Sequence, residues 1–280
     1  LEFRRVLFRS SLVYTNVTEH VKIGDAPADF QRLAPSFTVS LQPWQEQLLF
    51  LRLMYKSTFR MPTFNDLYYY RLGNRSLRPE KANEYNMGIT WSRSFSSFLN
   101  YLSVTVDGYY NDVTDKIVAF PTTYAWKMAN YGKVHVTGMD ATLAAAASLG
   151  KNMVLVVSGG YTWQKAIDLT DATSKSYKDQ LPYTPKHSGN VSAVLEMPWV
   201  NVGYSIVGVS ERYSMSQNIP ENRIDGYMEH TASLSRNFSF RHCKLRLQAE
   251  IINMTDTQYD VIKYYPMPGR SWRLTGTIEF

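Results

Sequence analysis

The chain has 280 residues, a formal net charge of +6 and a single cysteine, Cys243. One cysteine excludes an internal disulfide and a cysteine-based metal cluster. The basic residues alternate with acids and form no patch or recognition helix, which argues against a nucleic-acid partner. Hydrophobic residues make up 44% of the chain, and the mean hydropathy is −0.30. No run of about eighteen apolar residues predicts a transmembrane helix, but a membrane barrel would show no such run either.

The first ten residues read LEFRRVLFRS and do not alternate between apolar and polar side chains. Arg4, Arg5 and Arg9 interrupt the apolar stretch of about 7–15 residues that a signal peptide requires. We therefore interpret residues 1–10 as a leader foreign to the natural protein, and we assign residues 11–280 to the folded part.

From residue 11 onward, alternation and turn residues predict about twelve β-strands. They cover 12–17, 32–41, 46–60, 81–93, 99–117, 131–148, 151–166, 183–197, 200–213, 223–238, 242–256 and 268–280. The alanine-rich stretch 141–149 is predicted as strand rather than helix, because every second residue forms one apolar or small face.

The connections between these strands alternate between short and long. The short ones lie at 42–45, 94–97, 150–151, 198–199 and near Arg241. The long ones lie at 18–31, 61–80, 118–130, 167–182, 214–222 and 257–267. Outer-membrane barrels have short turns at one end and long loops at the other, whereas a soluble β-sandwich has no reason to do so.

The last two strands each have one apolar and one polar face. In the last strand, Trp272, Leu274, Gly276, Ile278 and Phe280 alternate with Arg273, Thr275, Thr277 and Glu279. In the preceding strand, the polar face carries Lys244, Arg246, Gln248 and Glu250. An Arg or Lys facing lipid at the bilayer midplane costs about 2–4 kcal/mol, so we expect the polar face to line a wet lumen. Trp91, Trp163 and Trp272 are candidates for the aromatic belts at the membrane interfaces.

Three segments carry a family resemblance. Segment 59–68 reads FRMPTFNDLY and is followed by Gly73-Asn74 and by LRPE at 77–80. Segment 109–117 reads YYNDVTDKI and is followed by NYGK at 130–133. Segment 253–259 reads NMTDTQY, and YPMPGRS at 265–271 leads into a last strand that ends in Phe280. Together these segments, in this order, resemble the TonB-dependent outer-membrane receptors, chiefly their siderophore and cobalamin branch.

The resemblance implies an all-β, transmembrane, antiparallel up-and-down β-barrel of about twenty-two strands around a plug domain. The strands predicted here would form its C-terminal half, without the plug, the TonB-contacting segment or a signal peptide. It further implies a monomeric barrel in the outer membrane of a Gram-negative bacterium, surrounded by lipopolysaccharide and outer-membrane lipid. Such a receptor binds a ferric siderophore, haem or cobalamin at its extracellular loops and imports it without covalent chemistry. The energy comes from the TonB–ExbB–ExbD complex, which contacts the missing N-terminal part.

Ligand-binding candidates are the aromatic and basic residues of the long loops, because aromatic faces and directed hydrogen bonds grip a bulky polar ligand. They are Tyr68, Tyr69, Tyr70 and Arg71 in one loop, Tyr124 and Trp126 in the next, and Tyr264 and Tyr265 in the last. The competing interpretation is that these side chains pack the loops or anchor them at the membrane boundary.

The sequence shows no catalytic motif, metal-ligand spacing or cofactor site, so we do not expect an enzyme. The alternative is a complete twelve-stranded barrel, either an autotransporter translocator or an outer-membrane phospholipase. A translocator needs a helix before its first strand, and residues 11–31 have no helical period. A phospholipase needs a serine and a histidine on one face, for which His230 with Ser233 or Ser235 is the only tempting set.

Overall fold

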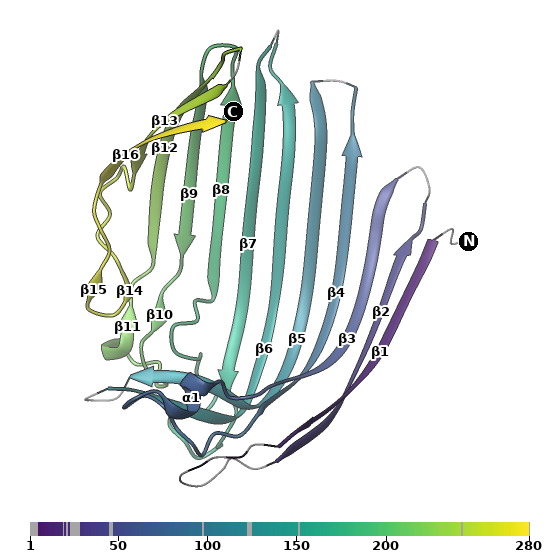
Figure 1. Ribbon diagram of the computed structural model, residues 1–280, viewed down its shortest axis with the longest axis vertical. Helices are drawn as coiled ribbons and strands as arrows, with labels where there is room; N and C mark the ends of the chain where they lie inside the picture. Colours follow the sequence, from purple (N-terminus) through teal and green to yellow (C-terminus); the bar gives the residue numbers. More distant parts are fainter. Residues whose placement is uncertain are drawn as a thin grey trace.

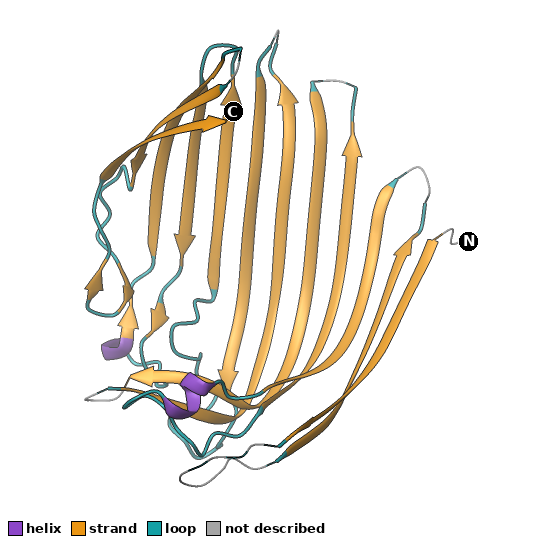
Figure 2. Ribbon diagram, in the orientation of Figure 1, coloured by secondary structure: helices purple, strands orange, loops and turns teal. Residues whose placement is uncertain are grey.

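The computed structural model describes residues 5–18, 20, 22, 29–44, 47–96, 98–121, 125–150, 152–241 and 243–279. A single antiparallel sheet of twelve strands dominates these residues (Figures 1 and 2). Its strands are β1 (Arg5–Val17), β2 (Phe30–Gln42), β3 (Leu48–Arg60), β4 (Glu80–Ser94), β5 (Leu99–Pro121), β6 (Trp126–Ser148), β7 (Val154–Asp168), β8 (His187–Glu196), β9 (Asn201–Val209), β12 (Tyr227–Ser239), β13 (Lys244–Ile252) and β16 (Ser271–Glu279). The all-β, up-and-down architecture is confirmed.

The remaining elements are short and belong to the connections. They are α1 (Phe64–Tyr68), η1 (Pro220–Asn222), and the paired strands β10 (Arg212–Tyr213) with β11 (Arg223–Ile224) and β14 (Asp260–Ile262) with β15 (Tyr265–Pro266). No helix in the described part of the chain is both long and apolar enough to cross a membrane.

Each strand of the sheet pairs with its neighbour in the chain order, and the sheet is open. Within the described residues, β1 pairs with β2 alone and β16 pairs with β13 alone. The chain thus forms part of a barrel wall. The strand β1 begins at Arg5, opposite Gln42, and so includes residues 5–10, which the sequence-based fold prediction left out.

The largest departure from the predicted strands is in the 118–130 connection. The sequence predicts a long loop there, but β5 and β6 continue to Pro121 and from Trp126, and they pair in register as far as Pro121 opposite Trp126. Ile117 and Val118 are β-branched and favour strand, which agrees with the extension. By contrast, β8, β9 and β12 are shorter than predicted, because residues 183–186, 210–213 and 223–226 belong to the connections, in which 212–213 and 223–224 form β10 and β11.

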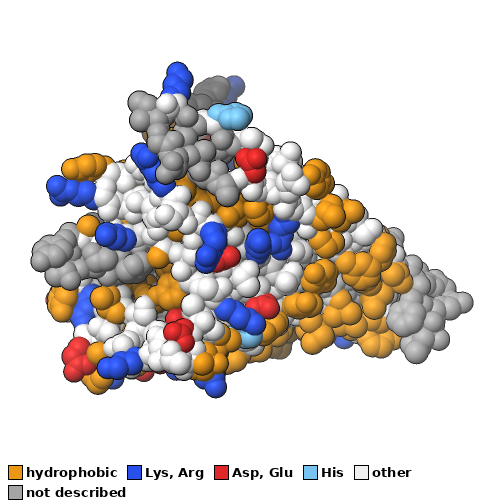
Figure 3. All heavy atoms as spheres, turned by 90° about the horizontal axis from the view of Figure 1, so that it is seen from below, with side chains coloured by type: hydrophobic (Ala, Val, Ile, Leu, Met, Phe, Trp, Pro, Cys, Tyr) orange, Lys and Arg blue, Asp and Glu red, His pale blue; other side chains and the backbone are white. Residues whose placement is uncertain are grey.

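The short turns lie at one end of the sheet and the long connections at the other, as predicted (Figure 1). We call the end with the long connections the mouth. It comprises α1 and its loop (61–79), the tip of β5 and β6, and the connections 169–186, 210–226 and 253–270. Viewed toward the mouth, Lys and Arg side chains are spread over the surface, and hydrophobic side chains gather on one side (Figure 3).

Strand register sorts the side chains onto two faces. Between β13 and β16, Ala249 lies opposite Leu274, and Glu250 lies opposite Arg273, whose Nε donates to the Glu250 carboxylate at 2.6 Å. We call the face of Leu274 the outward face and the face of Arg273 the inner face. The residues predicted to line the lumen share the inner face: Lys244, Arg246, Gln248, Glu250, Arg273 and Glu279. Trp91, Trp163 and Trp272 have the register of the outward face.

The inner face is bridged by charged side chains halfway along the sheet. Arg52 donates to Asp107 at 2.8 Å, across the intervening Gly88 of β4. A Cβ at Gly88 would lie 2.0 Å from the Asp107 carboxylate, so only glycine leaves room for this ion pair. The bridge shows why a charged residue is tolerated on this face: it finds a partner across a neighbouring strand.

Candidate functional site

The loop between β3 and β4 begins with a short helix that the sequence-based prediction missed. The Thr63 hydroxyl accepts from the Asp66 amide at 3.2 Å, and the Asp66 carboxylate accepts from the Thr63 amide at 2.8 Å. This reciprocal pair is a capping box, which satisfies amide groups at the start of α1. The sequence signal for this helix is Thr-x-x-Asp, which lies within the first resemblance segment. The helix buries Leu67.

A set of polar contacts holds this loop against the extended tip of β5 and β6. Arg78 forms an ion pair with Asp115 at 2.5 Å. The side-chain amide of Asn130 accepts from the Arg78 backbone amide and donates to the Arg78 carbonyl, both at 2.9 Å. The Glu80 carboxylate accepts from the Ile117 backbone amide at 3.0 Å. Two of the three resemblance segments are therefore joined to each other, and these polar residues have a structural role at the mouth.

Apolar side chains reinforce this junction from the inner face. Leu67, Leu77, Ile117 and Met128 form one buried cluster, and Val113, Val134, Val136, Ala166 and Leu181 form another. The second cluster exists because the 169–186 connection folds back over the ends of β5, β6 and β7, where the Leu181 amide donates to the Ala166 carbonyl at 2.8 Å. Both clusters give the loops fixed positions.

The third resemblance segment closes the last loop on itself. Asn253, which is 1% exposed, donates through its side-chain amide to the carbonyl of Thr257 at 2.9 Å and to that of Pro268 at 3.4 Å. The Asp256 carboxylate accepts from the Arg270 amide at 2.8 Å. Side chains at the start of this loop, Asn253 and Asp256, therefore bind the backbone at its end, at Pro268 and Arg270.

The candidate Trp126 is the first residue of β6, not a loop residue as predicted. Its ring lies 5.9 Å from the ring of Tyr183. Burial raises the pKa of Tyr183 above its ordinary value, and the Lys263 backbone beside the Tyr183 hydroxyl opposes this shift. Trp126 is therefore connected to the last loop through a tyrosine that sequence reasoning did not select.

The other candidates differ in exposure. Tyr68 is half-buried, since it packs against the cluster around Leu67 and lies beneath Arg75. Tyr69, Tyr70, Tyr264 and Tyr265 are 59%, 79%, 82% and 70% exposed. Arg71 and Lys263 lie over the rings of Tyr70 and Tyr264 at 5.1 and 5.5 Å. Tyr124 lies outside the described residues.

Contacts bring three parts of the mouth together: the loop of Tyr70 and Arg71, the end of β6 with Trp126, and the segment of Lys263 and Tyr264. We call this group of residues the collar. The Met128 amide donates to the Leu72 carbonyl at 3.0 Å, which places the loop of Tyr70 and Arg71 beside the strand end that carries Trp126. The Trp126 ring contacts the Tyr183 ring, and the Tyr183 hydroxyl lies beside the backbone of Lys263. The collar offers aromatic faces and cationic groups at its surface, and this combination suits a large polar ligand.

A further group in the collar was missed by sequence reasoning. Tyr259 stacks on Tyr227 with 3.9 Å between ring centroids, and its hydroxyl donates to Glu229 at 2.5 Å. Burial, followed by this hydrogen bond, raises the pKa of Tyr259 well above the ordinary 10.0. Arg212, which is 4% exposed, lies 5.7 Å from the Tyr227 ring and donates to the Asp260 carbonyl at 2.5 Å. Only Tyr259 belonged to a recognisable segment.

The serine–histidine arrangement that an outer-membrane phospholipase needs is not formed by the residues that the sequence suggested. His230 lies on the outward face, where its Nδ1 is 2.7 Å from the Tyr204 hydroxyl. Ser233 and Ser235 lie on the opposite face, in register with Glu250 and Gln248. All three residues belong to β12, but the sheet lies between the histidine ring and both hydroxyls.

The match to a known family now decides the class of protein. Residues 9–254 match the family described as TonB dependent receptor-like, beta-barrel. The chain belongs to this family. Members of the family are receptors and transporters of the Gram-negative outer membrane, not enzymes, and TonB and small-molecule ligands are implied for them.

Similar proteins support the same family. The chain is 25% identical over 230 residues to the vitamin B12 transporter BtuB of Photobacterium profundum, covering 79% of this chain and 34% of the transporter. The siderophore receptor PiuA of Acinetobacter baumannii superposes with a TM-score of 0.69 at 18% identity, covering 98% of this chain and 41% of PiuA. The ferric-catecholate import receptor Fiu of K12 E. coli gives 0.68 at 18% identity, covering 98% and 42%. The chain thus spans about a third of the length of the curated relative, and the structural likeness shows the fold.

Proposed function

We propose that the whole protein is an outer-membrane receptor that binds a scarce ligand at the mouth and imports it with TonB-transmitted energy. The ligand class is a ferric siderophore, haem or cobalamin. The observation that carries this proposal is the collar itself, in which loops distant in sequence are fastened together and hold Tyr70, Arg71, Trp126 and Tyr264 at one end of the sheet.

The chemistry of the collar fits these ligands. Each is large and polar, carries flat conjugated or chelating groups, and has hydrogen-bond acceptors or negative charge at its edge. Exposed tyrosines offer flat apolar faces with a hydroxyl at the rim, and the cations beside them attract acceptors and negative charge. Among the three, cobalamin is the first to test, because a curated relative is a vitamin B12 transporter.

The remaining parts of the receptor follow from the open sheet. We infer that about ten further strands pair with the free edges of β1 and β16, since unpaired edges in lipid leave backbone groups without partners. The complete barrel would be monomeric, would lie in the outer membrane among lipopolysaccharide and other lipids, and would contact the TonB–ExbB–ExbD complex through its N-terminal part. A complete twelve-stranded barrel is disfavoured because, within the described residues, β1 and β16 do not pair with each other.

Uptake by the full-length receptor tests the proposal. It would be expressed in a Gram-negative host lacking its own cobalamin and siderophore receptors, with and without tonB. Labelled cyanocobalamin, haem and a ferric catecholate would be supplied separately. We expect saturable uptake of one ligand that disappears without tonB. Uptake of none, together with no binding to the purified receptor, would refute the transport function.

Two loop variants locate the binding site. Tyr70→Ala and Tyr264→Ala should each weaken binding about tenfold, by removing an exposed aromatic face from the collar. The matched control is Trp199→Ala, which removes an aromatic side chain that is 62% exposed in the short turn at the opposite end. Equal effects of all three substitutions would contradict binding at the mouth.

A further inference from the structure

Arg212, in the connection between β9 and β12, is a buried cation that contacts the last loop. Its side chain is 4% exposed, and its Nη2 nitrogen donates to the carbonyls of Asp260 at 2.5 Å and Val261 at 3.0 Å. The other terminal nitrogen, Nη1, is buried and has no hydrogen-bond partner in the part of the chain that the structure describes. Burying a guanidinium on neutral partners stabilises a fold poorly, so the position of Arg212 points to a role other than stability.

The two acceptors are successive residues of β14, and a bulge makes both of them available. Successive residues of a regular strand face opposite sides. The register of β14 against β15 shifts between Asp260 and Ile262, so Val261 is an extra residue without a place in the ladder. The bulge thus lets one nitrogen of Arg212 bind two neighbouring carbonyls.

Asp260 also fixes the tip of the hairpin that β14 and β15 form. Its carboxylate accepts from the Tyr264 amide at 2.9 Å, and Tyr264 has a positive φ of 69°. A tyrosine rarely adopts this left-handed conformation unless its surroundings hold it there. Two contacts, from Arg212 to Asp260 and from Asp260 to Tyr264, therefore join the buried guanidinium to an exposed ring of the collar.

On its other side, β10 holds the aromatic pair of the collar. The carbonyl of Tyr213, next to Arg212, accepts from the Tyr183 amide at 2.7 Å, and the Tyr183 ring contacts the Trp126 ring. The charge of Arg212 opposes the effect of burial, which raises the pKa of Tyr183. Two neighbouring residues of β10 therefore link two parts of the collar.

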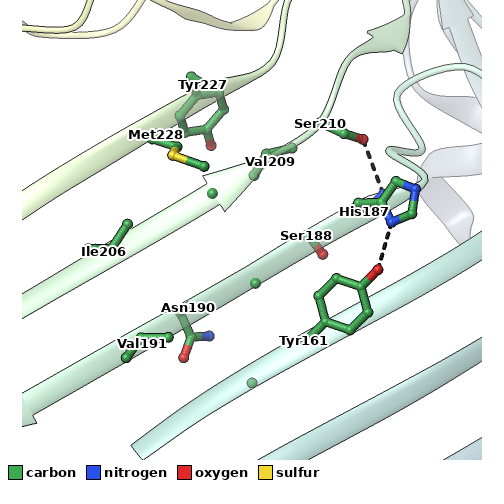
Figure 4. Close-up of a pocket in the computed structure, with 13 residues that line it drawn as sticks. Tyr161, His187, Ser188, Asn190, Val191, Ile206, Val209, Ser210, Tyr227 and Met228 are labelled. Atoms are coloured by element: carbon green, nitrogen blue, oxygen red, sulfur yellow. Dashed lines mark hydrogen bonds between the residues drawn. The ribbon is translucent and has the colours of Figure 1, made fainter.

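The connection that carries β10 is itself fixed to the sheet at both ends. Ser210 opens it, and the Ser210 hydroxyl accepts from the His187 backbone amide at 3.1 Å (Figure 4). Tyr227 begins β12 directly after it, and the Arg212 guanidinium lies 5.7 Å from the Tyr227 ring, a cation–π contact. Arg212 thus reaches the hairpin from a fixed base.

We propose that Arg212 is a positioning residue of the collar, which holds the β14–β15 hairpin and so sets the place of Tyr264 relative to Trp126 and Tyr183. This inference rests on the proposed function, because it assigns Tyr264 to the ligand site. Arg212 is buried and acts through the Asp260 carbonyl and the turn that the Asp260 carboxylate closes. Lysine is not equivalent here, because it lacks the planar fork of donors.

The test measures the ligand affinity of the purified full-length receptor, with whichever of cyanocobalamin, haem and a ferric catecholate the wild type binds. We expect Arg212→Met and Tyr264→Ala each to weaken binding about tenfold, and the double variant to weaken it about tenfold as well, since both changes remove the same contact. Arg212→Met combined with Tyr70→Ala should weaken binding about a hundredfold, because Tyr70 lies in another loop. A role in general stability would make the effects multiply in both combinations.

The matched control is Arg223→Met. Arg223 lies opposite Tyr213 in β11, and its ion-pair partners Glu211 and Asp225, both at 3.1 Å, belong to its own connection. The variant therefore removes the same charge from the same connection, and it should bind ligand like the wild type. Arg212→Lys keeps the charge but loses the planar fork, and it should bind about threefold more weakly than the wild type.

The proposal is overturned if Arg212→Met binds like the wild type or if its effect multiplies with that of Tyr264→Ala. It is also overturned if Arg212→Lys binds like the wild type while Arg212→Met does not, because charge alone would then matter. If Arg212→Met does not fold, Arg212→Lys takes its place in both combinations.

Hydrogen exchange of residues 260–266 separates this inference from the proposed function, because it needs no ligand. We expect exchange about tenfold faster in Arg212→Met and unchanged in Arg223→Met. Unchanged exchange in Arg212→Met would overturn the positioning role whether or not a ligand binds. A wild type that binds none of the three ligands would instead refute the proposed function, and the exchange would still decide whether Arg212 holds the hairpin.

Discussion

The mouth and the body of the sheet are stabilised in different ways. At the mouth, the ends of the strands and the loops bury apolar side chains, such as Val134 at 0%, Leu77 at 5% and Leu181 at 4% exposure. In the body, apolar side chains stay exposed, such as Leu274 at 81% and Leu53 at 50%. The body is built for lipid on its outward face, so it needs no protein to cover its apolar side chains. The mouth stands in water and must make its own core.

The difference teaches where side-chain changes should matter. In the body, backbone hydrogen bonds between strands carry the structure, and they do not depend on the side chain. At the mouth, the loops are held by packing and by specific polar contacts such as Arg78 with Asp115. Substitutions of the same kind should therefore be costly at the mouth and cheap on the inner face of the body.

The largest effect is expected for Val134→Asp. Val134 is fully buried and lies opposite Val113 and the buried Asp168, so a new carboxylate would be desolvated next to an existing one. We expect a loss of about 3–5 kcal/mol in the stability of the mouth. Limited proteolysis of the 169–186 connection in the full-length receptor would measure it. Val156→Asp is the control: it lies on the inner face of the body, opposite Val194, and should cost less than half as much.

A second test compares two consecutive residues of β6. Leu143 is 42% exposed on the outward face, opposite Gly159, and Ala144 lies on the inner face, opposite Ser158. Leu143→Arg should cost about 2–4 kcal/mol in lipid vesicles, because it places a cation in hydrocarbon. Ala144→Arg should cost about 0–1 kcal/mol, because it faces water. Denaturant unfolding in vesicles would compare them, and equal costs would contradict the assignment of the two faces.

A third test concerns the fastening of the last loop. Asn253→Ala removes two hydrogen bonds donated to the Thr257 and Pro268 carbonyls and one accepted from the Thr257 amide. We expect a loss of about 2–3 kcal/mol, because these buried groups are left without partners. Hydrogen exchange of residues 253–270 would report it. The control is Met254→Ala, which changes the neighbouring side chain, 38% exposed. If exchange became faster to the same degree in both variants, a specific role for Asn253 would be contradicted.

Much of the body could be predicted from the sequence, because a period of two reports directly on a sheet with different faces. Less of the mouth could be predicted. The sequence predicts a loop at the tip of β5 and β6, because the contacts that stabilise this tip, with Leu67 of α1 and with Leu72, come from residues far away in sequence. The capping box at Thr63 is a local signal that could have been used. The contacts of Arg212 depend on the last loop and have no local signal.

The resemblance segments have a different meaning in the structure from the one that ligand recognition would give them. Asp115, Asn130 and Asn253 fasten loops to strands or to themselves. The exposed aromatics Tyr70 and Tyr264 lie in the sequence gaps between these segments, at 69–72 and 260–264. The segments that identify the family thus hold the loops in place. The exposed side chains between these segments are the ones that we expect to differ between receptors for different ligands.

The smallest effect is expected for Tyr259→Phe, and it depends on pH. The Tyr259 hydroxyl donates to Glu229, and its pKa is raised above the ordinary 10.0 by burial and by this bond. A raised pKa contributes stability that is fully present below about pH 10 and is lost as the pH rises toward the folded-state value, because the unfolded chain ionises first. At neutral pH, Tyr259→Phe should cost about 1–2 kcal/mol through the lost hydrogen bond. Hydrogen exchange of residues 253–270 from about pH 8 to about pH 11 should show alkaline loosening in the wild type that is reduced in Tyr259→Phe. Tyr265→Phe, at a side chain 70% exposed, is the control and should keep the wild-type profile, whereas an unchanged profile in Tyr259→Phe would show that this hydroxyl does not hold the loop.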